Sequence, residues 1–369
     1  MSFRKVFDCF NWNDTSQSIY SKTGKDVLQA INNSGNCTLE DFMALISPAA
    51  EKYLEEMAQL SHQLTTTRFG KVMQMYIPMY LSNECQNICT YCGFSFENKI
   101  DRITLNEEQI LQEIRAIKDL GYDHILLVSG ESNKTVGVEY FEKVIRLIHP
   151  YFSNIMLEVQ PLETDEYIRL VKAGVNTVLV YQETYHEQNY KTYHPKGKKS
   201  NFNYRIDTPD RLGQADVHRI GLGALLGLED WRVDSFFTAL HLHYLEKKYW
   251  KTKYSISFPR LRPASGCQQP NHPVSDKQLV QLICAYRIFN KNVELSLSTR
   301  ESPKFRDHVM KLGITSMSAG SKTDPGGYAS TLHALEQFEI SDERSPAAVA
   351  SMIEAQGYEP VWKDWDRAF

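Results

Sequence analysis

Three of the chain's seven cysteines, Cys85, Cys89 and Cys92, fall within eight residues. Thiolates gathered at this density indicate metal binding, redox chemistry or a disulfide. Structural zinc sites have four ligands, usually supplied as two spaced pairs of cysteine or histidine, and the sequence contains no second pair. Iron–sulfur clusters are held by cysteine thiolates, normally four for a cubane. Three ligands from one segment therefore favour a [4Fe–4S] cluster with one iron left open to bind another ligand.

The same three cysteines could instead be apolar thiols buried along one helix, because positions i, i+4 and i+7 share a helix face. The residues between them are mostly polar, and Gly93 follows Cys92 directly. Polar neighbours and a glycine disfavour a buried helix face. The metal-binding interpretation is therefore preferred.

Composition excludes several classes of protein. The chain has 369 residues, of which 42% are apolar, and its net charge is −4 without a basic stripe, so nucleic acid is not an expected partner. The N-terminus lacks the apolar run of a signal peptide, and no stretch approaches the roughly 20 apolar residues that span a bilayer. An odd number of crowded cysteines does not resemble a secreted disulfide framework. We expect a cytoplasmic protein without a membrane partner.

The elements that must position the cysteines follow from hydrophobic periodicity. From Val72 onward, short β-rich runs alternate with amphipathic helices, which predicts a parallel sheet with right-handed crossovers. Eight such units over roughly 250 residues predict an α/β fold, a (β/α)8 TIM-type barrel. A doubly wound sheet is the alternative, but no G-x-G-x-x-G follows the first strand. The expected strands are residues 75–81, 124–129, 154–159, 177–181, 220–225, 254–258, 293–298 and 315–318.

The sequence divides into three parts. Residues 1–72 carry apolar positions at three- and four-residue spacing and predict a helical N-terminal extension. Residues 73–324 are the expected barrel, where Thr104 to Glu107 predicts a capping box at a helix start. Residues 325–369 are an expected C-terminal tail that packs on the barrel, because Trp362 and Trp365 lie near its end.

The C-terminal ends of barrel strands carry the chemistry in this fold. The second strand ends in Ser129, Gly130 and Glu131, where a glycine lets the backbone approach a ligand and a carboxylate can accept from an ammonium. An ordinary turn is the alternative. The third strand ends with Glu158. A carboxylate in an apolar strand is costly unless it is paired, either with ligand hydroxyls or with a buried Arg or Lys.

Later strands end in further polar groups. The run after the fourth strand includes Glu183 and His186, and without a third metal ligand nearby it favours the wall of a ligand pocket. The fifth strand carries Gly223 in a glycine series that tight packing would also explain. Arg300 ends the seventh strand, where its planar fork suits a carboxylate; a salt bridge to Glu301 or Asp324 is the alternative.

Two serines follow the eighth strand, Ser318 and Ser321, and they could face the same ligand as Arg300. Taken together, the strand ends predict one polar pocket above the barrel. The cysteine loop after the first strand would lie on its rim.

The spacing C-x3-C-x-aromatic-C, with Tyr91 in the aromatic place, resembles that of the radical S-adenosylmethionine (SAM) enzymes. Over essentially the whole chain, further segments are similar to the aromatic amino acid lyase branch, in particular the tyrosine lyases of bacterial thiamine biosynthesis. These segments are residues 158–161, 182–186, 209–213, 259–263, 297–303, 318–322 and 360–365. A hydrogenase maturase that splits tyrosine is also similar, but it has a C-terminal domain with further cysteines, whereas no cysteine follows Cys284 here.

The resemblance implies a [4Fe–4S] cluster on the three cysteines, with SAM chelating the open iron. It places Tyr91 and Gly223 near the adenine of SAM and Glu158 on the ribose hydroxyls. The family has a Gly-Gly-Glu-like segment that binds the SAM amino group. The residues 129–131 look like a variant of it, with serine in place of the first glycine.

The resemblance also implies a reaction. The Cα–Cβ bond of L-tyrosine is cleaved to 2-iminoacetate (dehydroglycine) and p-cresol, while SAM becomes methionine and 5′-deoxyadenosine. Arg300 would hold the tyrosine carboxylate with help from Ser318 or Ser321, and Glu183 would handle a proton. A thiazole synthase would receive the imine, and a flavodoxin-like or ferredoxin-like protein would supply the electron. The alternatives are a lyase of another aromatic amino acid, such as tryptophan, and a non-enzymatic barrel that binds a structural metal.

Overall fold

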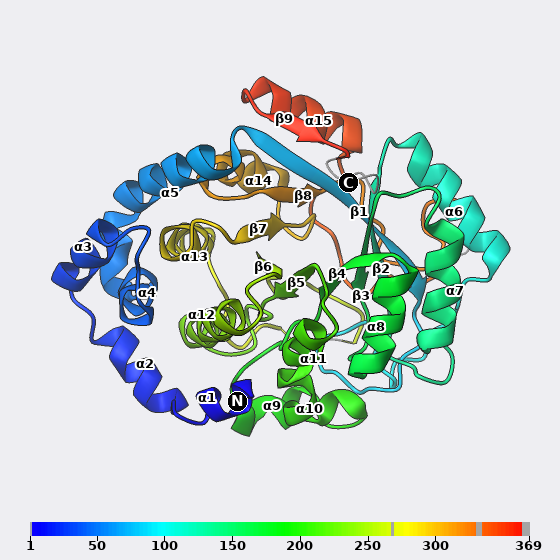
Figure 1. Cartoon of the computed structure of the whole chain (residues 1–369), viewed down its shortest axis with the longest axis horizontal. Helices are drawn as coiled ribbons and strands as arrows, with labels where there is room; N and C mark the ends of the chain where they lie inside the picture. The colour runs from blue at the N-terminus through cyan, green and yellow to red at the C-terminus, as the bar shows by residue number, and fades with distance from the viewer. Residues whose placement is uncertain (1, 267–268, 330–333, 364–369) are drawn as a thin grey trace.

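A computed structural model describes residues 2–266, 269–329 and 334–363. Eight parallel strands run in the order β2 to β8 and then β1, and β1 also pairs with β2, which closes the barrel. The predicted (β/α)8 barrel is confirmed, and the doubly wound sheet is wrong (Figure 1). The strands are β1 (Val72–Ser82), β2 (His124–Ser129), β3 (Asn154–Glu158), β4 (Val175–Leu179), β5 (Arg219–Leu222), β6 (Lys253–Ser257), β7 (Glu294–Leu297) and β8 (Ser316–Ser318).

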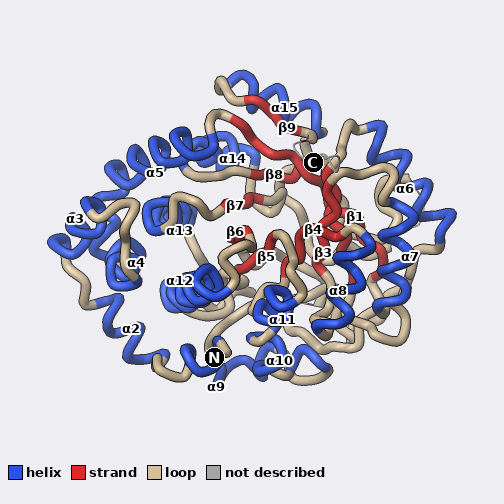
Figure 2. The backbone as a smooth tube through the Cα atoms, viewed as in Figure 1, coloured by secondary structure: helices blue, strands red, loops and turns tan. Residues whose placement is uncertain are grey.

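Helices between the strands cover the outside of the barrel, as the blue and red segments of Figure 2 show. They are α6 (Glu107–Asp119), α7 (Val138–Ile148), α8 (Thr164–Ala173), α9 (Glu187–Tyr193), η2 (Lys198–Ser200), α10 (Phe202–Ile206), α11 (Thr208–Gln214), α12 (Trp231–Lys248), α13 (Asp276–Phe289), α14 (Pro303–Val309) and η3 (Met310–Leu312). The predicted capping box at Thr104 is wrong. Asn106 and Gln109 form the box that begins α6, because the Thr104 side chain is hydrogen-bonded to Ser82 instead.

The N-terminal part is helical, and it packs on one side of the barrel against α12 and α13 (Figure 1). It comprises α1 (Phe3–Phe7), α2 (Trp12–Tyr20), α3 (Gly24–Asn32), α4 (Leu39–Ile46), η1 (Pro48–Tyr53) and α5 (Leu54–Phe69). Polar side chains join the layers where α4 ends. Gln281 donates to the carbonyls of Leu45 and Ser47, and Arg232 donates to the carbonyl of Ile46.

The C-terminal part contains α15 (Pro346–Ala355) and β9 (Glu359–Val361). The sequence did not predict β9, which pairs in parallel with the first residues of β1 outside the barrel. Trp362 packs edge-on against Tyr122, with ring centroids 4.9 Å apart, and Trp365 lies outside the described residues. We propose the division into 1–72, 73–324 and 325–369 as the chain's organisation. No helix in the described ranges is long and apolar enough to cross a membrane.

The interior of the barrel is unusually polar. In most TIM barrels, Val, Ile and Leu fill the interior in layers. Here the first side chain of every strand that lines the interior cavity is polar. These side chains are Gln74, His124, Asn154, Thr177, Arg219, Ser255, Glu294 and Ser316.

Candidate active site

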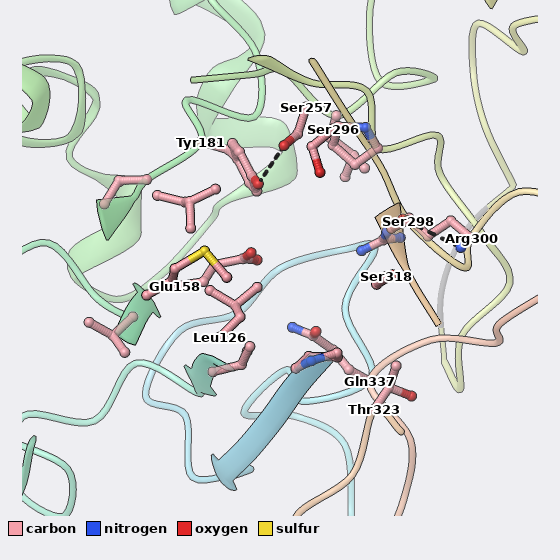
Figure 3. A pocket seen from close by; sticks show the side chains of 18 of the residues that line it. Leu126, Glu158, Tyr181, Ser257, Ser296, Ser298, Arg300, Ser318, Thr323 and Gln337 are labelled. Atoms are coloured by element: carbon pink, nitrogen blue, oxygen red, sulfur yellow. Dashed lines mark hydrogen bonds between the residues drawn. The ribbon is translucent and has the colours of Figure 1, made fainter. Parts of the chain in front are cut away.

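A cavity opens at the C-terminal ends of the strands and extends into the barrel (Figure 3). It gathers almost all of the residues that the sequence predicted for the site: Cys85, Cys89, Tyr91, Cys92, Ser129, Gly130, Glu131, Glu158, Glu183, Arg300, Ser318 and Ser321. Gly223 is not part of this lining. A Cβ atom there would lie 2.8 Å from the carbonyl oxygen of Ser257 and 3.1 Å from the ring of Tyr181, so close packing accounts for this glycine.

The cysteine loop follows β1 and is not helical, so the interpretation of the cysteines as one face of a buried helix is wrong. Arg102 organises the loop: its guanidinium donates to the carbonyls of Asn83 at 2.7 Å, Phe94 at 2.9 Å and Ser95 at 2.8 Å. Outside contacts complete the support, since the Ile88 N–H donates to the carbonyl of Lys196 at 3.0 Å. The thiols are thus positioned before any ligand binds.

A charged network lies beside the cysteine loop. Arg205 forms ion pairs with Glu131 at 2.9 Å and with Glu183 at 3.4 Å, and Lys199 lies 2.8 Å from Glu183. Burial acts to raise the pKa of both carboxyls, but the two cations hold each pKa below its usual value. Glu183 has a backbone φ of +71°, a conformation that costs an ordinary residue about 1 kcal/mol or more.

Tyr91 is held in one orientation. Its hydroxyl lies 2.6 Å from Nε2 of His194, and Nδ1 of His194 lies 2.8 Å from the carbonyl oxygen of Tyr190. The ammonium of Lys199 is 5.7 Å from the centre of the Tyr91 ring. The aromatic face is therefore fixed at the edge of the cavity, next to the cysteines.

Arg300 is directed into the cavity from the loop after β7 (Figure 3). Its guanidinium lies over the ring of Phe338, 3.3 Å from the centroid. The salt bridge to Glu301 or Asp324 is not found among the described residues; Glu301 binds Arg260 instead, with Nε 2.9 Å from a carboxylate oxygen. Burial lowers the pKa of Arg300. The fork is thus available to a ligand carboxylate.

Two buried hydroxyls on the cavity wall have no hydrogen-bond partner within the described ranges, those of Ser129 and Ser321. Buried polar atoms are normally satisfied, so these oxygens indicate positions that a ligand would fill. The hydroxyl of Ser318, by contrast, accepts from the Thr299 N–H at 3.2 Å. Ser129 is the last residue of β2, and Ser321 lies on the loop after β8.

Comparison with known sequences supports this arrangement. The Radical SAM superfamily matches residues 79–239, which include the cysteine loop, and the Biotin and Thiamin Synthesis associated domain matches residues 257–359. The 2-iminoacetate synthases of Escherichia coli (strain K12) and Salmonella typhimurium (strain LT2) are each 52% identical to this chain, over 96% of its length and 94% of theirs. The chain belongs to the 2-iminoacetate synthase family.

Solved structures agree with this membership. HydG, described as a maturase of the [FeFe]-hydrogenase, superposes with a TM-score of 0.91 at 31% identity, over 95% of this chain and 80% of that one. Methylornithine synthase (PylB) has a TM-score of 0.73 at 18% identity, which shows a shared fold alone. As a member of its family, the protein is a radical SAM lyase. It uses a [4Fe–4S] cluster and SAM to cleave tyrosine to 2-iminoacetate for thiamine synthesis. The non-enzymatic alternative is thereby excluded.

The residues of this 2-iminoacetate synthase family member fit the cluster. All three thiols are free, and the Gln337 amide lies 3.6 Å from the Cys92 sulfur as a donor. Burial raises the pKa of each thiol, and backbone N–H groups act in the opposite direction at Cys85 and Cys92. Within the described ranges, no three His, Cys, Asp or Glu side chains lie close enough together to hold one metal ion. A cubane does not require this convergence, because each cysteine binds a different iron atom.

Sequence reasoning missed four residues of the site: Lys199, Arg205, His194 and Gln337. Each of the four contacts a predicted site residue, and in every case the two partners come from different segments of the chain. The run Lys196 to Ser200 contains three lysines, and this was the one available signal. A basic loop of this kind usually indicates an exposed surface, so the signal could not have singled out Lys199.

The carboxyl of Glu158 lies inside the cavity at the end of β3 (Figure 3). No ion pair to Glu158 is found in the described part of the chain, so the predicted alternative of a buried Arg or Lys pair is not observed. Burial raises its pKa to about 7, although the positive charge of Arg300 partly opposes this effect. Glu158 is therefore half-ionised near neutral pH until a ligand binds.

This elevated pKa makes stability depend on pH. Below the ordinary carboxyl pKa of 4.5, the folded and unfolded chains both carry the proton. Between pH 4.5 and about 7 only the folded chain keeps it, so stability falls as pH rises through this window. We expect Glu158→Gln to raise the melting temperature of the cluster-free protein at pH 8, and the gain to shrink toward pH 5. Thermal denaturation at several pH values measures this.

The exposed Glu108 on α6 offers a matched control, since Glu108→Gln removes a carboxyl that water already solvates. It should not give the rise in melting temperature at pH 8 that is expected of Glu158→Gln. A gain in the Glu158 variant that is independent of pH would contradict the assignment of the elevated pKa.

Proposed function

We propose that Cys85, Cys89 and Cys92 hold the [4Fe–4S] cluster of this radical SAM tyrosine lyase at the rim of the barrel. The observation that carries this assignment is the convergence of three free, pre-positioned thiols on the cavity that also contains Arg300. A cluster held by these three thiols would supply, once reduced, the electron for reductive cleavage of SAM, the chemistry that starts hydrogen abstraction from the substrate. The chain's own contribution is to bind, orient and enclose.

SAM binds across the mouth of the cavity between the cysteine loop and the ends of β2 and β3. Glu131, kept ionised by Arg205, accepts from the SAM amino group, and the unsatisfied Ser129 hydroxyl adds a further hydrogen bond. Gly130 is required because a Cβ atom there would collide with the carbonyl of Glu84. Glu158 accepts from the ribose hydroxyls and Tyr91 packs near the adenine. The placement of Gly223 at the adenine stays a prediction.

Tyrosine binds in the same cavity, with its carboxylate on the guanidinium of Arg300. The buried Ser321 hydroxyl, which has no partner in the described ranges, donates to the same carboxylate, and Ser318 lines the adjoining wall. Glu183 is held ionised by Lys199 and Arg205, so it accepts a proton rather than donating one. Phe338 and Gln337 also line the cavity, and a lining that excludes water protects a radical from side reactions.

The imine product and the electron that the reaction consumes each imply a partner protein. An imine is hydrolysed in water, which supports direct transfer of 2-iminoacetate to a thiazole synthase. The cluster must be reduced from outside, which supports a flavodoxin-like or ferredoxin-like donor. We place both partners and this enzyme in the cytoplasm.

The test is anaerobic. Protein reconstituted with iron and sulfide is mixed with SAM, dithionite and tyrosine, and 5′-deoxyadenosine and p-cresol are separated by chromatography. Both products should appear in equal amounts, and replacing tyrosine by tryptophan should abolish cleavage of the amino acid. Deoxyadenosine without p-cresol would contradict the tyrosine site, while cleavage of tryptophan at a similar rate would favour the broader aromatic lyase.

A further inference from the structure

A short segment that follows the barrel in the chain, residues 336–342, returns to the active-site cavity, and we call it the C-terminal strap. Gln337 and Phe338 of the strap line the cavity. Its backbone is bound to the cysteine loop and to the loops after β6, β7 and β8. The N–H groups of Gln337, Glu339 and Ser341 donate to the carbonyls of Thr323, Pro263 and Thr299 at 2.9, 3.0 and 2.9 Å, and the Gly93 N–H donates to the Gln337 carbonyl at 3.1 Å. The strap is thus fixed relative to the cysteines.

Gly93, which directly follows Cys92, allows the strap to approach the cysteine loop closely. A Cβ atom at Gly93 would lie 2.8 Å from the carbonyl oxygen of Gln337 and 2.9 Å from that of Glu336. Any other residue would push the strap away, because only glycine lacks a Cβ atom. This close approach brings the Gln337 side chain to a cysteine sulfur.

The amide of Gln337 is oriented by a contact on its other side. The hydroxyl of Tyr80 on β1 donates to Oε1 at 2.8 Å, and Nε2 faces the Cys92 sulfur at 3.6 Å. A thiolate that binds iron has no proton and can only accept a hydrogen bond, which demands this orientation of the amide. Among the described residues, no other side chain is found to donate to a sulfur of the cysteine loop.

We propose that Gln337 is a positioning residue for the reaction, which raises the reduction potential of the cluster by stabilising negative charge on the Cys92 sulfur. This inference rests on the proposed function, in which Cys92 is a cluster ligand. Reduction adds negative charge that the sulfur ligands share, so an N–H donor stabilises the reduced form more than the oxidised form. The amide of Gln337 therefore makes the cluster easier to reduce.

Two variants of Gln337 separate this role from a structural one. Gln337→Met keeps the length of the side chain but removes both amide groups. Gln337→Glu keeps an oxygen that accepts from the Tyr80 hydroxyl, and it places a carboxylate oxygen where the donor was. A structural contact with Tyr80 would be lost in the first variant and kept in the second. Stabilisation of charge at the sulfur is lost in the first and reversed in the second.

Redox titration of the reconstituted protein without SAM, followed by electron paramagnetic resonance, measures the midpoint potential of the cluster. In Gln337→Met, the ratio of reduced to oxidised cluster at a fixed potential should fall about tenfold, which corresponds to about 59 mV for a one-electron couple. Gln337→Glu should show a larger fall. Gln86→Met is the matched control, since Gln86 is exposed in the same cysteine loop, and its potential should equal that of the unsubstituted protein.

The iron content should be the same in all of these proteins. Unchanged potentials in both Gln337 variants would overturn the inference. A fall in Gln337→Met alone, or loss of iron from both variants, would also overturn it, because either result indicates a structural contact. If the unsubstituted protein held no [4Fe–4S] cluster, the proposed function itself would fail instead.

Discussion

Cys89→Ala should abolish 5′-deoxyadenosine formation while the barrel stays folded. Cys89 is the central member of the cysteine loop and is 6% exposed, and among the described cysteines only Cys85 and Cys92 line the same cavity. The loop itself depends on Arg102 and on backbone contacts rather than on the sulfur. Chromatography of deoxyadenosine after incubation with SAM and dithionite measures the loss, and circular dichroism measures the fold.

Cys9 provides the comparison for this prediction. It is exposed near the end of α1, distant in sequence from the loop and absent from the cavity lining. Cys9→Ala should keep the brown colour, the iron content and the rate of SAM cleavage. Deoxyadenosine production at an undiminished rate in Cys89→Ala would show that the cluster is held elsewhere.

Arg300→Ala should weaken tyrosine binding about 10- to 150-fold, with little change for SAM. A hydrogen bond to a charged group contributes about 1.5–3 kcal/mol, and each 1.4 kcal/mol corresponds to about tenfold in affinity. Glu301 is already paired with Arg260, so this carboxylate keeps its partner when Arg300 is removed. Kd values for tyrosine and SAM, measured separately on reconstituted protein, test the prediction.

Two further variants refine the role of Arg300. Arg300→Lys keeps the charge but loses the planar fork, so it should recover only part of the affinity. Arg169→Ala removes an arginine on the outer face of α8 and should leave both Kd values unchanged. Equal losses of tyrosine and SAM affinity in Arg300→Ala would indicate a general distortion of the cavity and count against a carboxylate clamp.

Much of the fold could be predicted because its signals are local. Alternation of β-rich runs and amphipathic helices predicted eight strands, and β2 was predicted with its observed bounds of His124–Ser129. The sequence-based predictions were wrong or incomplete where a segment distant in the chain binds the same side chain or strand edge. Thr104 bonds Ser82 rather than capping a helix. β9 exists only because the outer edge of β1 is available to pair with it.

By itself, the sequence determined the barrel, the loop that carries the three cysteines, and the positions of Glu131, Glu158 and Arg300 at strand ends. These features depend on spacing within a few residues and on the rule that parallel strands present their C-terminal ends together. The tertiary structure alone decided which charges meet. It joined Lys199 and Arg205 to the predicted carboxylates and left Arg300 open to a ligand. The physical reason is range: an ion pair forms only within about 4 Å, and side chains from distant segments reach that distance only after the barrel has closed.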